Sequence, residues 1–97
     1  LEDKLIYVQG YISEVRLNET AIMAVLETYN APEEKWLIGL SLTDYSSYQT
    51  LKDTFENKYV SIAGKYLGFS NVSNLPSMSF EFANIYGGGA YKFEDFI

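Results

Sequence analysis

The spacing of apolar residues constrains this chain more than any other feature of its sequence. Five segments alternate apolar and polar side chains with a period of two, which is typical of strands that bury one face. They cover residues 5–17, 21–29, 35–42, 59–66 and 77–85. Turn-forming residues separate them, with a proline in the polar loop 30–34 and a turn-rich loop at 68–77. The pattern predicts five short strands.

One segment, between the third strand and the fourth, has a different period. Tyr48, Leu51 and Phe55 follow the spacing of a helix, Ser46 begins a capping box, and Asn57 suits the left-handed end of a helix. Three strands, a short helix and two more strands match a five-stranded Greek-key barrel, whereas a β-sandwich needs about seven strands. We therefore expect an all-β fold with one short helix in the order β-β-β-α-β-β.

The chain divides at its three consecutive glycines. We expect residues 1–86 to form the barrel and residues 87–97 to form a glycine hinge and an aromatic tail, packed on the barrel or on a partner. Alternation places Met23, Val25 and Leu37 together on the outer face of the second and third strands. Exposed apolar patches usually mark a contact surface. We expect the tail to fold over this patch or to dock on a neighbouring copy or domain.

The charge of the chain disfavours a polyanionic ligand. Thirteen acidic residues against seven basic ones give a net charge of −6, and the basic residues form no local cluster. Most nucleic-acid binders carry a basic surface, because neutralised phosphates supply much of their affinity. No apolar run approaches the roughly 18 residues that a membrane span needs. The sequence therefore predicts neither nucleic-acid binding nor a membrane span.

Several side chains on which catalysis most often depends are absent. The chain has no histidine and no cysteine, so the commonest general base, thiol nucleophiles and ordinary zinc sites are excluded. The acidic residues Glu33, Glu34 and Asp44 lack the regular ligand spacing of a calcium loop. The sequence predicts a protein that is not an enzyme and that has no cofactor and no metal.

The chain has nine tyrosines, six phenylalanines and one tryptophan, and two groups of these aromatic residues stand out. Trp36, Phe55, Phe80 and Phe82 lie on the inward positions of strands or on the helix stripe, which indicates core packing. Tyr7, Tyr11, Tyr29, Tyr66 and Phe69 lie elsewhere. This second group either covers strand surfaces or surrounds one end of the barrel, where tyrosine rings can stack on a sugar or a peptide.

Four stretches carry a resemblance to a known family. NKYVSIAGKY at residues 57–66 resembles the fourth strand, and VQGYISEV at 8–15 the first strand, of bacterial oligonucleotide/oligosaccharide-binding (OB) domains. Gly68-Phe69-Ser70 and Leu75-Pro76 resemble exported and lipoprotein-associated modules of this class, which also includes anticodon-binding domains. The resemblance covers residues 5–86. It implies an OB-type barrel and a secreted or cell-envelope location in a bacterium.

Together these observations predict a non-catalytic accessory or interaction module of a larger, exported bacterial protein. Its expected partner is a protein or a neighbouring domain, with self-association open. The alternatives are a single-stranded nucleic-acid or anticodon-type OB domain and a carbohydrate-binding module. The candidate binding residues are Tyr11, Met23, Val25, Leu37, Tyr66, Phe69, Asn71 and Asn74.

Overall fold

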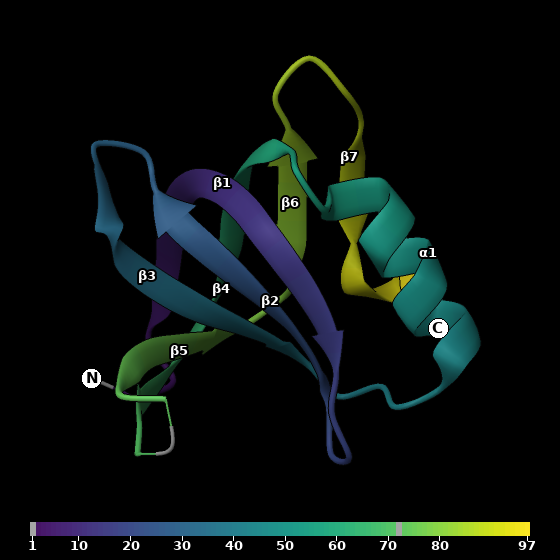
Figure 1. The fold of residues 1–97 in the computed structure, drawn as a ribbon, viewed down its shortest axis with the longest axis horizontal. Helices are drawn as coiled ribbons and strands as arrows, with labels where there is room; N and C mark the ends of the chain where they lie inside the picture. Colours follow the sequence, from purple (N-terminus) through teal and green to yellow (C-terminus); the bar gives the residue numbers. More distant parts are fainter. Residues whose placement is uncertain (1, 72) are drawn as a thin grey trace.

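The computed structural model describes residues 2–71 and 73–97, which form one sheet of seven strands (Figure 1). The strands are β1 (Leu5–Leu17), β2 (Ile22–Thr28), β3 (Ala31–Leu40), β4 (Tyr59–Ser70), β5 (Leu75–Ser79), β6 (Phe82–Ile85) and β7 (Ala90–Lys92). Helix α1 (Tyr45–Phe55) follows β3, and a 3-10 helix, η1 (Phe93–Phe96), follows β7. No helix of this described part is long and apolar enough to cross a membrane.

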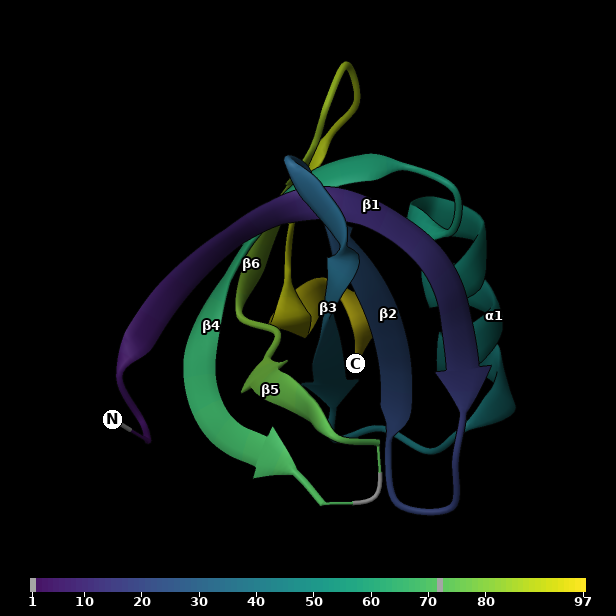
Figure 2. The same cartoon turned by 60° about the vertical axis from the view of Figure 1, so that its left-hand side comes forward.

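Five of the strands close into a barrel. Their order is β1-β2-β3-β5-β4, and a further pairing of β4 with β1 joins the two ends. The pairing of β3 with β5 is parallel, and the other pairings are antiparallel. Figure 2 shows β1 bending over the top of the barrel, so that it pairs with β4 along its first half and with β2 along its second. The predicted five-stranded barrel with its helix after the third strand is confirmed.

Two glycines allow the strands to curl this tightly. A Cβ atom at Gly10 would overlap the backbone carbonyl oxygen of Glu27 on β2. A Cβ atom at Gly64 would overlap the backbone carbonyl oxygen of Ser79 on β5. Glycine is the residue that lets two backbones approach so closely. The close approach of backbones at Gly10 on β1 therefore has its counterpart at Gly64 on β4.

Helix α1 closes one end of the barrel. Its inner face buries Leu51 and Phe55, and Tyr48 packs on the core beside them, as the spacing predicts. The predicted cap at Ser46 is wrong, because the helix is capped two residues earlier by Asp44, whose carboxylate accepts a hydrogen bond from the backbone N–H of Ser47 at 2.9 Å. Asn57 ends the segment in the left-handed conformation, with φ at 65°.

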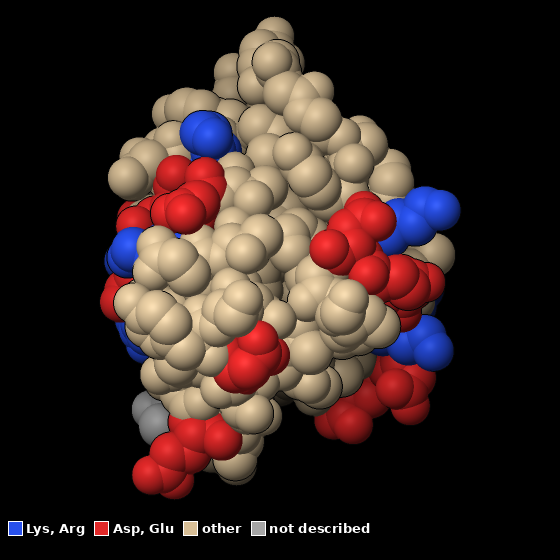
Figure 3. Space-filling view, turned by 90° about the vertical axis from the view of Figure 1, so that its right-hand side faces the viewer, with Lys and Arg blue, Asp and Glu red and all other residues tan. Residues whose placement is uncertain are grey.

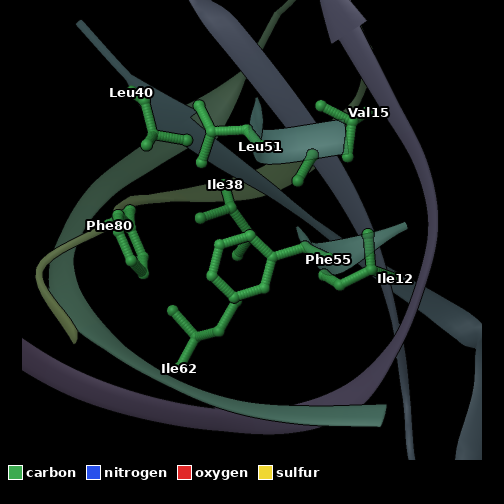
Figure 4. A pocket seen from close by; sticks show the side chains of 9 residues that line it. Ile12, Val15, Ile38, Leu40, Leu51, Phe55, Ile62 and Phe80 are labelled. Carbon is green, nitrogen blue, oxygen red and sulfur yellow. The ribbon is translucent and has the colours of Figure 1, made fainter. Parts of the chain in front are cut away.

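The core lies between this helix and the inner faces of the strands. Nine of its apolar residues surround a cavity of about 20 Å³ (Figure 4). They are Ile12, Val15, Ala24, Ile38, Leu40, Leu51, Phe55, Ile62 and Phe80. A space of this size is large enough for one water, but its lining offers no polar side chain to hold one. The cavity is a packing defect of the core and not a ligand site.

The predicted loop at 30–34 belongs largely to β3. Thr28 pairs with Ala31 and Glu27 with Lys35, so residues 32–34 bulge out of the ladder. The Thr28 hydroxyl donates to the backbone carbonyl of Glu34 at 3.0 Å, which holds this bulge. A bulge of this kind lets Pro32 lie within a strand without a ladder bond.

The predicted fifth strand is two strands, β5 and β6. The backbone N–H of Lys65 donates to the Ser79 hydroxyl at 2.9 Å, and the ladder is interrupted at residues 80 and 81. The inward positions therefore change from even to odd numbers, and Ala83 is fully buried. The prediction that Phe82 points inward is wrong, since its side chain is 36% exposed.

The C-terminal tail extends the sheet. Gly87, Gly88 and Gly89, expected to be a hinge, lie in the turn of the hairpin that joins β6 to β7, where Gly88 N–H donates to the carbonyl of Ile85 at 2.9 Å. Beyond β7, η1 turns back between α1 and the barrel (Figure 1). Phe96 of η1 is buried in the core, with its ring centroid 5.7 Å from that of Phe55.

Candidate binding groove

The structure does not form the expected apolar patch of Met23, Val25 and Leu37. Val25 and Leu37 pair directly across β2 and β3 and are only 5% and 4% exposed, although neither belongs to the barrel core. Their low exposure means that other side chains on the outer face of the sheet cover them. On β1, Glu14 lies directly across from Val25 and forms a salt bridge with Arg16 at 3.0 Å. The tail lies against α1 and not over this patch. Val25 and Leu37 are therefore too buried to serve as binding residues, and Met23, which is half-buried on the same face, loses the patch that it was expected to form with them.

The remaining candidates lie in two separate places. Tyr11 pairs with Tyr59 across β1 and β4, whereas Tyr66 lies seven residues farther along β4. Seven residues of strand span at most about 23 Å. Phe69 is 57% exposed beyond Tyr66, and Asn71 and Asn74 follow in the turn to β5. Val72 lies outside the described residues.

The structure fixes the ring of Tyr11. Its hydroxyl donates to the Asn57 side-chain oxygen at 2.9 Å, and its ring centroid lies 5.0 Å from that of Tyr59. Tyr66 instead meets Trp36 edge to face, with centroids 6.0 Å apart. Tyr11, Tyr66, Phe69 and the asparagines therefore do not form one site.

A groove of about 970 Å³ crosses the outer surface beside Tyr59. Its floor follows the sheet, where Gln9 pairs with Ser61 and Ser61 with Asn84. We call it the tyrosine groove, and its lining residues are Gln9, Gly10, Tyr29, Tyr59, Val60, Ser61, Asn84, Ile85, Tyr86 and Gly87.

The strands position the three tyrosines of this groove. Tyr59 begins β4, and its carbonyl accepts the backbone N–H of Tyr86 at 2.8 Å, which fixes Tyr86 beside it. Tyr29 stands in the β2–β3 turn, where its N–H donates to the carbonyl of Gln9 at 3.1 Å. The side chains of Tyr29, Tyr59 and Tyr86 are 67%, 55% and 90% exposed. Three solvated aromatic rings thus border a floor of amide and hydroxyl groups.

The tyrosine groove carries no charge, although the whole chain has a net charge of −6. None of its ten lining residues is acidic or basic. The β6–β7 hairpin, which forms one wall, stands at the top of Figure 3 without a charged side chain, while the acidic groups lie lower on the molecule. The groove therefore offers aromatic surface and neutral hydrogen-bonding groups, and no cation for a phosphate.

A second groove, of about 640 Å³, adjoins the first and shares Gln9 and Tyr29 with it. It runs between the first half of β1 and the β2–β3 hairpin. We call it the edge groove, and its lining residues are Tyr7, Val8, Gln9, Thr28, Tyr29, Asn30, Ala31, Glu34 and Trp36.

The perturbed acid–base groups of the protein lie at α1 and not in either groove. Hydrogen bonds from Ser47 lower the pKa of Asp44. The backbone N–H of Val15 and the ammonium of Lys52 lower the pKa of Glu56, whose hydrogen bond in turn raises the pKa of Lys52. These shifts follow from helix capping and from the contact between α1 and β1, so they have a structural cause.

Metal ligands are not grouped in the described part of the chain, where no three acidic side chains come together.

The chain matches no protein-family model and no curated protein. The grooves must therefore be interpreted from their own chemistry.

Sequence reasoning missed Tyr59 and Tyr86 as site residues. Tyr59 was part of a strand signature, and Tyr86 preceded an expected hinge. Their shared surface arises from the pairing of β4 with β6 and from the hairpin after β6, and neither follows from local periodicity.

Proposed function

We propose that this protein is a non-catalytic interaction module that binds a partner protein through the tyrosine groove. The observation that carries the proposal is the composition of the groove: three exposed tyrosines around Gln9, Ser61 and Asn84, with no charge. Tyrosine is enriched at protein interfaces, while Lys, Glu and Asp are depleted there. Antibody paratopes use the same combination of rigid tyrosine with adaptable Ser, Asn and Gly.

The exposure of the tyrosines supports this assignment energetically. Residues whose truncation weakens an interface by about 2 kcal/mol or more are enriched in Tyr, Trp and Arg. Tyr59 and Tyr86 stand side by side and retain 55% and 90% of their accessible surface, so a partner can still bury most of both rings. A charged ligand would find no counter-ion among the lining residues.

The setting of this module belongs to the same proposal. The likeness of Gly68-Phe69-Ser70 and Leu75-Pro76 to exported and lipoprotein-associated OB modules supports a host protein of the bacterial envelope or exterior. The fold alone does not select a ligand, because OB-type barrels serve many unrelated functions.

Carbohydrate recognition is a second candidate. The amides of Gln9 and Asn84 and the hydroxyl of Ser61 stand between tyrosine rings, and OB-type barrels are known to bind oligosaccharides. Neutral amides can bond to sugar hydroxyls while a tyrosine ring stacks on the sugar face. Nothing in the groove favours a nucleic acid, since its lining carries no lysine or arginine.

The test compares three proteins: wild type, the double variant Tyr59→Ser/Tyr86→Ser, and Tyr45→Ser as a matched control. Tyr45 is 67% exposed on α1 and lines neither groove. Proteins retained from a lysate of the source organism are identified by mass spectrometry, and the affinity of each is then measured with purified protein. We expect wild type and the control to bind equally and the double variant to lose at least about thirtyfold, or about 2 kcal/mol.

Two other probes decide between ligand classes. A glycan array and a fluorescent single-stranded oligonucleotide at low salt are presented to the same three proteins. Glycan binding that the double variant loses would favour the carbohydrate candidate. Salt-sensitive oligonucleotide binding, or a protein partner that the double variant keeps at full affinity, would refute the proposal.

A further inference from the structure

The first half of β1 has an open edge. Residues 5–11 pair with β4 on one side, but pairing with β2 on the other side begins only at Gly10. In Figure 2 the first half of β1 is the outermost strand on the left, with β4 on its inner side and no strand beyond it. One side of residues 5–8 therefore lacks a strand partner in the described part of the chain.

The hydrogen bonds show which backbone groups face this open edge. Ile12 N–H donates to the carbonyl of Lys58 at 2.9 Å, and the carbonyl of Lys4 accepts the N–H of Tyr66 at 2.9 Å, so even-numbered residues of β1 bond toward β4. Bonding residues alternate in an antiparallel ladder. The N–H and C=O groups of Leu5 and Tyr7 therefore point to the open edge. In agreement, the carbonyl of Gln9 bonds on that side, to Tyr29.

This edge lacks the features that usually block strand addition. Proteins protect exposed edges with charges, prolines, bulges or covering loops. From Leu5 to Tyr11 the chain has no charged residue and no proline, and its ladder with β4 is regular. Leu5 and Tyr7 are 64% and 59% exposed. The backbone groups of this edge are thus accessible to another chain.

The edge groove lies alongside these groups. Its apolar contacts come mainly from Tyr7 and from Trp36, which is partly buried against the core and meets Tyr66 edge to face. Glu34 is the one charged residue among its lining. The groove thus combines an open strand edge with an indole surface and a single carboxylate.

We propose that an extended segment of a partner protein adds a strand to β1 at Leu5 and Tyr7 and fills the edge groove. The segment lies antiparallel to β1, as β2 does farther along, places an apolar side chain on Trp36, and carries a lysine or arginine that meets Glu34. Strand addition to an open edge is a common mode of peptide recognition, in which the backbone gives affinity and the pockets give specificity. The proposal rests on the proposed role in protein contact but uses a surface next to the tyrosine groove.

A basic segment suits this edge better than a second copy of the chain. Each copy carries a net charge of −6, and a copy docked through its own β1 would bring a second Glu34 toward the first. Like charges oppose such an association, whereas a cationic side chain is attracted. Self-association through β1 is therefore an alternative outcome of the test.

The experiment selects ligands from a displayed library of random eight-residue peptides on the wild-type protein. We expect enriched peptides to alternate apolar and polar residues and to contain a lysine or arginine. Synthetic versions with N-methyl groups on alternate backbone nitrogens then test strand addition. Methylation of the nitrogens that face β1 should weaken binding at least tenfold, and methylation of the others should leave it unchanged.

Variants of the protein supply the matched test. Tyr7→Pro removes an N–H that points to the open edge, and proline is tolerated at such edge positions; Tyr7→Val keeps the N–H and removes the ring. We expect Tyr7→Pro to lose at least tenfold more affinity than Tyr7→Val, and Glu34→Lys to weaken binding of the basic peptides. Thermal unfolding verifies that each variant is folded. If Tyr7→Pro does not fold, the comparison of the methylated peptides on the wild-type protein tests strand addition instead.

Several outcomes would overturn the proposal. It fails if no peptide is enriched, if methylation has no alternating effect, or if the wild-type protein forms a dimer that Tyr7→Pro abolishes. Peptides that bind Tyr7→Pro normally but fail to bind the Tyr59→Ser/Tyr86→Ser variant would support the tyrosine groove and refute the strand site. A peptide that binds both variants more weakly than wild type does not distinguish the two grooves. In that case amide exchange at Leu5 and Tyr7 of the wild-type complex decides: protection supports strand addition, and its absence refutes it.

Discussion

Replacement of Phe96 by alanine should destabilise the barrel strongly, although Phe96 is the penultimate described residue. The side chain is 8% exposed, and its ring centroid lies 5.7 Å from that of Phe55, 5.9 Å from that of Tyr91 and 6.0 Å from that of Phe80. Truncation of a buried phenylalanine to alanine costs about 3–5 kcal/mol. Because η1 lies at the edge of the core and can partly collapse, we expect a value near the lower limit, about 3 kcal/mol.

Thermal and urea unfolding, followed by circular dichroism, measure this effect. One kcal/mol shifts the Tm of a domain of this size by about 4–8 °C, so Phe96→Ala should lower the Tm by roughly 12–24 °C. Ile97→Ala is the matched control, because Ile97 is 73% exposed and its truncation should change stability by less than about 0.5 kcal/mol. Equal Tm values for the two variants would refute the conclusion that the tail completes the core.

Two further predictions concern β4 and α1. Gly64→Ala should cost about 1–3 kcal/mol, because the new Cβ would overlap the backbone carbonyl of Ser79. Gly39→Ala is the matched control, because its Cβ would lie at ordinary contact distances, 3.6 Å from the Met23 sulfur and 3.9 Å from the Met78 carbonyl oxygen; equal Tm values would contradict the steric argument. The pKa of Glu56 lies below its ordinary value of 4.5 because Val15 N–H and Lys52 bond to the carboxylate, so its stabilising effect is complete above about pH 4.5 and is lost as the pH falls through the folded-state pKa. The Tm of Glu56→Gln should therefore fall less than the Tm of wild type when the pH is lowered from about 5 to about 3. Parallel plots of Tm against pH for the two proteins would contradict this stabilising role of the Glu56 carboxylate.

The sequence predicted the barrel because its signals are local and agree with one another. Alternation over 5–17 gives the exact limits of β1, and the spacing of Tyr48, Leu51 and Phe55 identifies the face of α1 that packs on the core. These patterns depend only on which side of an element meets the core. They are independent of how distant strands pair.

The errors arise where tertiary contacts replace the local pattern. The prediction continued the alternation through residue 82 as if the strand were regular. In the structure the Ser79 hydroxyl accepts the hydrogen bond of the Lys65 N–H, the ladder is interrupted after Ser79, and different residues face inward beyond it. Parity correctly excluded Val25 and Leu37 from the barrel core, yet it could not show that neighbours on the outer face cover them. Burial on the outside of a sheet depends on side chains of adjacent strands, which a single strand does not specify.

The interruption at residues 80 and 81 links the core to the tyrosine groove. Because β6 continues along β4 after it, residues 82–85 add Asn84 to the outer row that begins with Gln9 and Ser61. The hairpin after β6 then raises Tyr86 beside Tyr59 and returns the chain to η1, where Phe96 enters the core. The same segment therefore forms one wall of the tyrosine groove and covers part of the core. It follows that a partner bound at Tyr86 should slow amide exchange in β7 and η1 as well as in the groove, since the short hairpin couples them.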